Sequence, residues 1–273
     1  MVQFFKFIFQ NRAALIVFIL FVLSTLWWIF LHMSGASSQA LQLWAASYQV
    51  IAWYGAILGL IISKRWGGWG SAMGRCVLAF SIGLFLQGFG QSSYSFYIYY
   101  LNTDVPYPSI GDVGYFGSVL MYIYAVVVLM RVVGSKIALG TYKGKIMAAV
   151  LPLILLSVSY WLFLQEYEFD WSQSMKIFLD FGYPLGQAFY LSLAILAFFF
   201  SRNILGGKMH MPIFYLLFAL CAQYIADFVF LLQASWGTWS AGGINDFVYS
   251  ISYFLMSVSL IYIGFIYRDI SEN

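Results

Sequence analysis

Residues 13–32 read AALIVFILFVLSTLWWIFLH, and this stretch decides the class of fold. It carries no Asp, Glu, Lys or Arg, and a helix of roughly 20 residues is long enough to cross the hydrocarbon core of a bilayer, about 30 Å thick. The run is also longer than the roughly 7 to 15 apolar residues of a secretory signal, so we expect a retained membrane anchor.

Comparable stretches recur along the whole chain. Of its 273 residues, 63% are apolar, 21% aromatic and only 8% charged, whereas an ordinary soluble domain carries about a quarter charged residues. The sequence therefore predicts an all-α, polytopic membrane helical bundle that forms a single membrane domain over residues 1–273. Eight transmembrane helices are expected, at residues 13–32, 41–63, 76–101, 113–133, 146–164, 174–200, 211–233 and 246–267.

The basic residues predict the orientation of this bundle. With eight spans, all the Lys and Arg residues except Lys176 fall in connections or helix ends on one side of the membrane. The charged residues in the connections on the opposite side are all Asp or Glu. Short cytoplasmic loops are enriched in Lys and Arg, so both termini are expected in the cytoplasm, with the chain in the plasma (inner) membrane of a bacterium. The net charge of +3 is then a feature of the topology. It suits contact with anionic lipid and gives no reason to expect a nucleic-acid partner.

Two acids lie inside the expected spans, where an ionisable group costs about 2.5 to 3.5 kcal/mol on insertion scales. They are Asp180 and Asp227, and Lys176 lies four residues before Asp180 on the same helical face. We expect Lys176 to pair with Asp180 or to bridge to Asp227. Two interpretations remain open: a structural ion pair that fixes helix packing, or a ligand-binding pocket that opens on the outer face.

Two further acids lie where expected helices begin. Ser109 and Asp112 have the spacing of a capping box, and Asp246 is placed to cap the last helix. Capping is the favoured interpretation for both, although each acid also starts an Asp-x-x-Tyr pattern that Asp180 shares. Glutamines in the spans either line a pocket or join helices by hydrogen bonds. The candidate ligand-binding residues are Asp180, Asp227, Lys176, Asp112, Asp246, Gln91 and Gln187.

The residues expected of common membrane cofactor sites and enzymes are missing from the sequence. Its two histidines, His32 and His210, are expected on opposite sides of the membrane, which disfavours a bis-histidine haem or a histidine metal site. The last two helices have no central lysine for a retinal Schiff base, and there is no phosphate-binding loop or nucleophile elbow. The sequence thus predicts a non-enzymatic protein and identifies no cofactor.

One motif and two shorter stretches resemble a known family. PSIGDVGY at residues 108–115 resembles the Pro-Ser-x-x-Asp-x-x-Tyr signature in the multi-helix membrane sensor regions of bacterial diguanylate cyclases and phosphodiesterases. YPLGQ at 183–187, and ADFVF at 226–230 followed by DFVY at 246–249, look similar and come in the same order. The resemblance covers residues 107–267. It departs at Gln187, where the family often has an acid, and in the signalling domain, which does not follow here.

This resemblance implies a freestanding relative that senses a ligand in an outer pocket and passes the response to a protein partner in the membrane or cytoplasm. The expected mechanism is a population shift between two helix packings that bind the ligand unequally. Two alternatives remain. A proton-coupled transporter of a small solute needs a continuous polar path to the inner side, and a structural or assembly subunit belongs to an oligomer or larger membrane complex.

Overall fold

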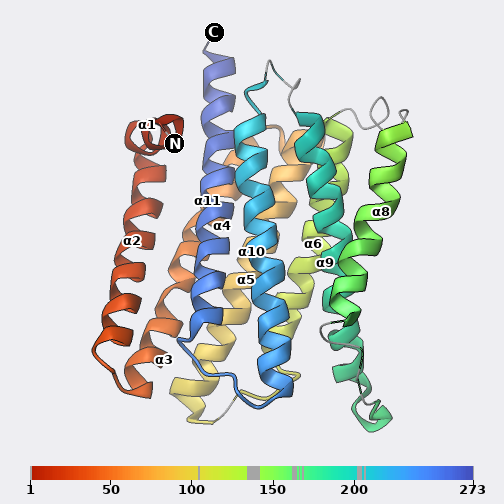
Figure 1. Cartoon of the computed structure of the whole chain (residues 1–273). Helices are drawn as coiled ribbons and strands as arrows, with labels where there is room; N and C mark the ends of the chain where they lie inside the picture. Colours follow the sequence, from red (N-terminus) through yellow and green to blue (C-terminus); the bar gives the residue numbers. More distant parts are fainter. Residues whose placement is uncertain are drawn as a thin grey trace.

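The computed structural model describes the backbone of residues 2–103, 105–133, 142–161, 165, 167, 169–201, 205 and 207–272, and the side chains of these residues other than 2–4, 143, 144 and 148. Within these ranges all regular structure is helical (Figure 1). The α-helices are α1 (Val2–Gln10), α2 (Arg12–Met33), α3 (Ser38–Ser47), α4 (Gln49–Arg65), α5 (Ala72–Phe96), α6 (Ile110–Val132), α8 (Tyr142–Ser159), α9 (Ser174–Phe200), α10 (His210–Ser235) and α11 (Ile244–Ser271).

Seven helical segments in the described part of the chain are long and apolar enough to cross a membrane. They are Arg12–Met33, Ser38–Arg65, Ala72–Leu101, Ile110–Val132, Trp171–Phe200, His210–Ser235 and Ile244–Ser271. Each coincides with one of the expected spans, which supports a multi-pass membrane bundle. The remaining expected span, 146–164, corresponds to α8, whose described apolar stretch is shorter, and its residues 162–164 lie outside the described ranges. The total of eight spans therefore stays a prediction.

The start of α6 shows how local sequence sets a helix boundary. The backbone N–H of Ser109 donates to Asp112 Oδ2 at 2.7 Å, and the Ser109 hydroxyl accepts from the N–H of Gly111 at 3.1 Å. Together they form the capping box that the sequence predicted. This cap fixes the first turn of α6, which carries Asp112 toward the interior of the bundle.

Six helices form a closed ring around a shared interior. In order around the ring, α4 contacts α5, α5 contacts α6, α6 contacts α9, α9 contacts α10, α10 contacts α11, and α11 returns to α4 (Figure 1). Outside the ring, α2 packs on α11 and α8 packs on α9. Side chains from all six ring helices can therefore meet in one place.

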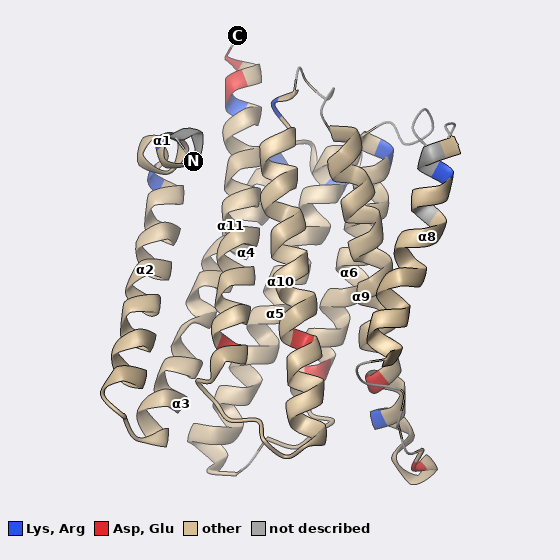
Figure 2. Ribbon diagram, in the orientation of Figure 1, with Lys and Arg blue, Asp and Glu red and all other residues tan. Residues whose placement is uncertain are grey.

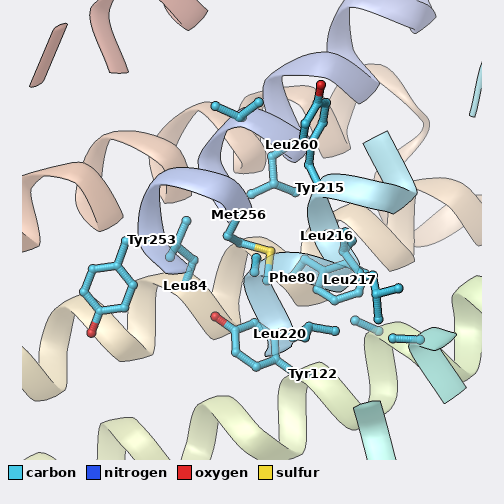
Figure 3. Close-up of a cluster of buried hydrophobic side chains, with 14 of the residues drawn as sticks. Phe80, Leu84, Tyr122, Tyr215, Leu216, Leu217, Leu220, Tyr253, Met256 and Leu260 are labelled. Atoms are coloured by element: carbon cyan, nitrogen blue, oxygen red, sulfur yellow. The ribbon is translucent and has the colours of Figure 1, made fainter. Parts of the chain in front are cut away.

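The two halves of the ring differ in charge. Most Lys and Arg residues lie at the end where α1 and the last turn of α11 are found, which we call the basic end (Figure 2). The aspartates of α6 and α10 and the aspartate in the first turn of α11 lie in the opposite half, which we call the acidic half (Figure 2). Between the acidic half and the basic end, the interior is filled by an apolar cluster that includes Phe80, Leu84, Tyr122, Leu216, Leu220 and Met256 (Figure 3).

Gly114 lets α5 and α6 approach closely. A Cβ atom at Gly114 would lie 2.5 Å from the carbonyl oxygen of Leu86 and 2.9 Å from the backbone nitrogen of Gly90. The contact is thus between two backbones, as in the small-residue interfaces of membrane helices. It sets the distance between two helices that both contribute to the acidic half.

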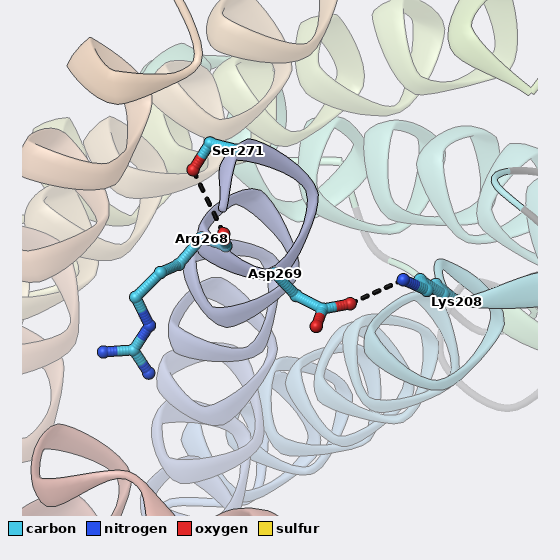
Figure 4. A network of polar contacts seen from close by, with 4 residues as sticks. All are labelled: Lys208, Arg268, Asp269 and Ser271. Atoms are coloured by element: carbon cyan, nitrogen blue, oxygen red, sulfur yellow. Dashed lines mark hydrogen bonds and ion pairs between the residues drawn. The ribbon is translucent and has the colours of Figure 1, made fainter. Parts of the chain in front are cut away.

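Lys208 and Asp269 form an ion pair at the basic end, with Nζ and Oδ2 2.5 Å apart (Figure 4). Their side chains are 50% and 42% exposed, so water screens the attraction. We expect Lys208→Met to change the free energy of unfolding by less than about 1 kcal/mol. Thermal unfolding of the detergent-solubilised protein measures this difference. A loss of stability well above about 1 kcal/mol would show that the pair of Lys208 and Asp269 contributes more than a solvent-screened surface ion pair.

Candidate functional site

A small cavity lies inside the ring in the acidic half, and we call it the acidic cavity. Its lining comes from α5, α6, α9, α10, α11 and the loop before α11. The centre of a water molecule has about 20 Å³ in which to move, which is room for about one water. The cavity is lined by Gln91, Tyr94, Asp112, Tyr115, Tyr183, Asp227, Phe230, Leu231, Trp239, Asp246 and Tyr249.

Asp227 is held by three donors from three helices. Tyr249 of α11 donates its hydroxyl to Oδ1 at 2.5 Å, and Gln223, one turn earlier on α10, donates Nε2 to Oδ2 at 3.0 Å. Gln187 of α9 also donates its amide to Oδ2. These bonds satisfy a carboxylate that is only 5% exposed, and they join α9, α10 and α11 at one point.

Asp112 acts both as a helix cap and as part of the cavity wall. Its Oδ2 closes the capping box with Ser109, while its Oδ1 accepts a hydrogen bond from the hydroxyl of Tyr183 at 2.9 Å. Tyr183 belongs to α9. Helix capping and pocket lining were alternative interpretations of Asp112, and the structure shows that its two carboxylate oxygens take separate partners.

Asp246 anchors the loop that precedes α11. The helix begins after Gly243, whose backbone is extended and which provides no side-chain cap. Asp246 lies in the first turn and accepts from the N–H of Gly242 at 2.6 Å and from the Tyr48 hydroxyl at 3.4 Å. The expected capping role is thus altered, because the bonded amide lies just outside the helix.

Asp180 lies outside the acidic cavity and is bound by two phenols. The hydroxyls of Tyr107 and Tyr167 each donate to it at 2.7 Å. Burial, together with the neighbouring Asp180, raises the pKa of Tyr107 above its ordinary value, and the same two causes raise the pKa of Tyr167. Both phenols therefore keep the proton that they donate.

The expected ion pairs of Lys176 are not formed. Among the described residues the only ion pair within 4.0 Å is that of Lys208 and Asp269, so Lys176 neither pairs with Asp180 nor bridges to Asp227. The physical reason is that phenols and amides already satisfy both carboxylates. Lys176 lies near the start of α9 and outside the cavity lining.

The carboxylates of the acidic cavity consequently have no basic partner in the described part of the chain. Asp112, Asp227 and Asp246 are 4 to 5% exposed and take their hydrogen bonds from neutral donors. Four tyrosines, one tryptophan and one phenylalanine supply aromatic surface to the same cavity. Negative charge beside aromatic faces is an environment that stabilises a cation.

A second cavity adjoins the first on its loop side, and we call it the vestibule. It offers about 230 Å³ to the centre of a water molecule and is lined by Val105, Tyr107, Gln233, Ala234, Gly237 and three aromatic residues. Those three, Tyr94, Phe230 and Trp239, also line the acidic cavity. Their ring centroids lie 6.0 to 6.3 Å apart in each pair. We call this group the aromatic partition, because it separates the two cavities.

The indole N–H of Trp239 is buried and has no hydrogen-bond acceptor among the described residues. Since a buried donor without an acceptor is costly, this group is available to an oxygen atom of a ligand. It lies in the partition, at the boundary between vestibule and acidic cavity.

On the side of the acidic cavity that faces the basic end, the interior of the ring becomes apolar. Tyr253 donates its hydroxyl to Gln87 Oε1 at 3.1 Å, and the Gln87 amide donates to Ser118 at 2.7 Å. Beyond this layer the apolar cluster fills the ring (Figure 3). The acidic cavity therefore faces the vestibule and not the basic end.

The structure brings together part of the expected site. Asp112, Asp227, Asp246 and Gln91 line one cavity, and Gln187 supports Asp227 from α9. Asp180 and Lys176 lie elsewhere.

Most of the aromatic side chains that line the acidic cavity were not among the predicted site residues. Tyr115, Tyr183 and Tyr249 are the tyrosines of the repeated Asp-x-x-Tyr pattern, and residues three apart share a helical face. That pattern was the signal. Phe230 is the last residue of the ADFVF stretch at 226–230 that carries part of the resemblance, whereas nothing in the sequence marked Trp239.

In the part of the chain that the structure describes, no group of three or more His, Cys, Asp or Glu side chains is arranged to hold a metal ion. Comparison of the chain with protein-family models, curated proteins and solved structures found no match to any of them.

Proposed function

We propose that this chain is a ligand-responsive membrane bundle that binds a small organic cation through the acidic cavity and passes the response to a partner protein. The observation that carries the proposal is the convergence of Asp112, Asp227 and Asp246 on one cavity with no base beside them in the described part of the chain. Functionless buried acids would be expected to be paired, because an uncompensated buried charge is costly.

The chemistry of the walls favours an organic cation over other small ligands. Carboxylates attract a positive charge and repel an anion, and the faces of Tyr94, Phe230 and Trp239 favour an ammonium group. A ligand hydroxyl would satisfy the free indole N–H of Trp239. Concave sites with aromatic walls and a few convergent polar groups are typical of small-molecule binding.

Binding would couple directly to helix packing. The acidic cavity has room for about one water, so an organic cation requires its walls to separate. Those walls belong to five helices of the ring, and a ligand that prefers the wider packing shifts the population toward it. This is the basis for a response that a partner protein detects.

The distribution of charge supports one orientation of the bundle in the membrane. The Lys and Arg residues gathered at the basic end (Figure 2) support a cytoplasmic position for that end and for both termini, in a plasma membrane. The vestibule would then open toward the outer side. The resemblance of residues 108–115 to bacterial membrane sensor regions agrees with this arrangement.

Transport of the cation is less well supported. A transporter needs a polar path to the other side, and the apolar cluster occupies the ring interior toward the basic end (Figure 3). We therefore expect no uptake of labelled choline by proteoliposomes. Uptake that depends on a pH gradient would favour the transporter and overturn a purely sensory role.

The test compares cations with their neutral isosteres. Choline is matched with 3,3-dimethylbutan-1-ol and methylammonium with methanol, each added to the detergent-solubilised protein before thermal unfolding. At about 100 times its dissociation constant, a cation that binds only the folded state stabilises it by about 2.7 kcal/mol, a shift of about 5 °C or more. The neutral partner is expected to have no such effect. If neither cation exceeds its isostere, the proposal is wrong.

A further inference from the structure

A second binding site is indicated at the basic end, far from the acidic cavity. A groove there lies between α2, α4 and α11 and offers about 220 Å³ to the centre of a water molecule. Apolar side chains form its wall, among them Leu58, Ile61, Ile261 and Phe265, and Arg65 and Arg268 lie at its polar end. An apolar wall with two guanidinium groups at one end is complementary to an amphipathic, anionic ligand.

Both guanidinium groups are free to bind such a ligand. Arg65 and Arg268 are exposed, and neither has a carboxylate within 4.0 Å among the described residues. The nearby Asp269 is taken by Lys208, and Arg268 points away from that pair (Figure 4). The guanidinium carbon of Arg268 instead lies 5.6 Å from the centroid of the Phe265 ring, a contact that orients it.

The arginines of the groove lie at the ends of two helical segments that are long and apolar enough to cross a membrane, which is where a lipid headgroup is expected. Arg65 is the last residue of α4, and Arg268 lies in the last turn of α11. Helix α1 lies across this end of the bundle (Figure 1), where Phe7 stacks on Tyr262 with centroids 4.2 Å apart. Short apolar helices placed in this way lie along the membrane interface.

We propose that this groove binds an anionic phospholipid, with its phosphate between Arg65 and Arg268 and an acyl chain along Leu58, Ile61 and Ile261. Arginine binds phosphate through a planar fork of donors, and basic pockets between helices on the cytoplasmic side bind acidic headgroups. A free phosphate shares the headgroup chemistry but has no chain to cover the apolar wall.

The experiment uses the purified full chain in mixed micelles that contain either phosphatidylglycerol or phosphatidylcholine with the same acyl chains. Phosphatidylglycerol is expected to raise the unfolding temperature in a saturable way, and phosphatidylcholine is not. In Arg65→Gln with Arg268→Gln, the apparent affinity for phosphatidylglycerol is expected to fall roughly tenfold or more. The matched control is Lys64→Gln with Arg131→Gln, which removes the same charge from exposed positions at the same end but outside the groove, and it is expected to change the affinity less than about twofold.

A third variant tests the apolar wall without changing charge. Ile61→Trp adds volume at a side chain that is 48% exposed and is expected to weaken phosphatidylglycerol binding by obstructing the chain. Three results would overturn the proposal: an equal loss in the control pair, equal stabilisation by inorganic phosphate, or phosphatidylglycerol binding that survives both the arginine pair and Ile61→Trp. None of these results depends on the cation proposed for the acidic cavity.

Discussion

Replacing Gly114 by valine is expected to lower the free energy of unfolding by about 3 kcal/mol or more, at the upper end of what overpacking costs. The reason is that the new side chain meets backbone. Its Cβ would lie 2.5 Å from the Leu86 carbonyl oxygen and 2.9 Å from the Gly90 nitrogen, and neither atom can turn away as a side chain can. The helices α5 and α6 must separate, and with them Gln91 and Asp112.

The matched control is Gly117→Ala, one turn further along α6. There the nearest atom to the new Cβ is Leu86 Cδ1 at 3.3 Å, and this methyl group can move by a rotamer change. We expect a change within about 1 kcal/mol. Both variants are compared with the unmodified chain by thermal unfolding in the same detergent. Equal stability of Gly114→Val and Gly117→Ala would show that α5 and α6 are not in backbone contact.

The second large effect is expected at Asp227. Asp227→Leu removes the acceptor for Tyr249, Gln187 and Gln223 and leaves three buried donors without a partner. Each unsatisfied group costs about 1 to 3 kcal/mol, so we expect a loss of about 3 kcal/mol or more in the free energy of unfolding. A variant as stable as the unmodified chain would contradict this hydrogen-bond network.

Asp227→Asn separates the charge from the hydrogen bonds. Asparagine keeps one acceptor oxygen and nearly the same shape, so the loss of stability is expected to be smaller than with leucine. The stabilisation by choline or methylammonium is expected to disappear, because the negative charge is gone. The control is Asp170→Asn, outside the membrane spans, where hydrogen bonds from Ser172 and Gln173 lower the pKa of an exposed carboxylate. If Asp227→Asn keeps the full response to the cation, Asp227 does not belong to the binding site.

Local interactions were the part of this molecule that the sequence could predict. Seven apolar segments appear where windows of about 20 residues placed them, because the bilayer thickness alone dictates that length. The capping box of Ser109 and Asp112 was also predictable, since its partners are three residues apart.

Contacts between residues that are far apart in the sequence could not be predicted in this way. The pair of Lys176 and Asp180 looked plausible at a spacing of four residues, yet Asp180 is bound by Tyr107, which is 73 residues away. Asp112 likewise meets Tyr183 across 71 residues. Such partners are chosen by the order of helices in the ring, and no periodicity within one helix encodes that order.

The closed ring has a mechanical consequence. In an open row of helices, two neighbours can move apart without disturbing the helices beyond the nearest free edge. The contact between α11 and α4 closes the ring, so no helix of the ring has a free edge. When α10 and α11 move apart, the other helix–helix contacts of the ring must adjust as well. A displacement of α10 at Asp227 therefore reaches α5, which lies three helix contacts away in either direction around the ring, without any chain of polar residues to transmit it.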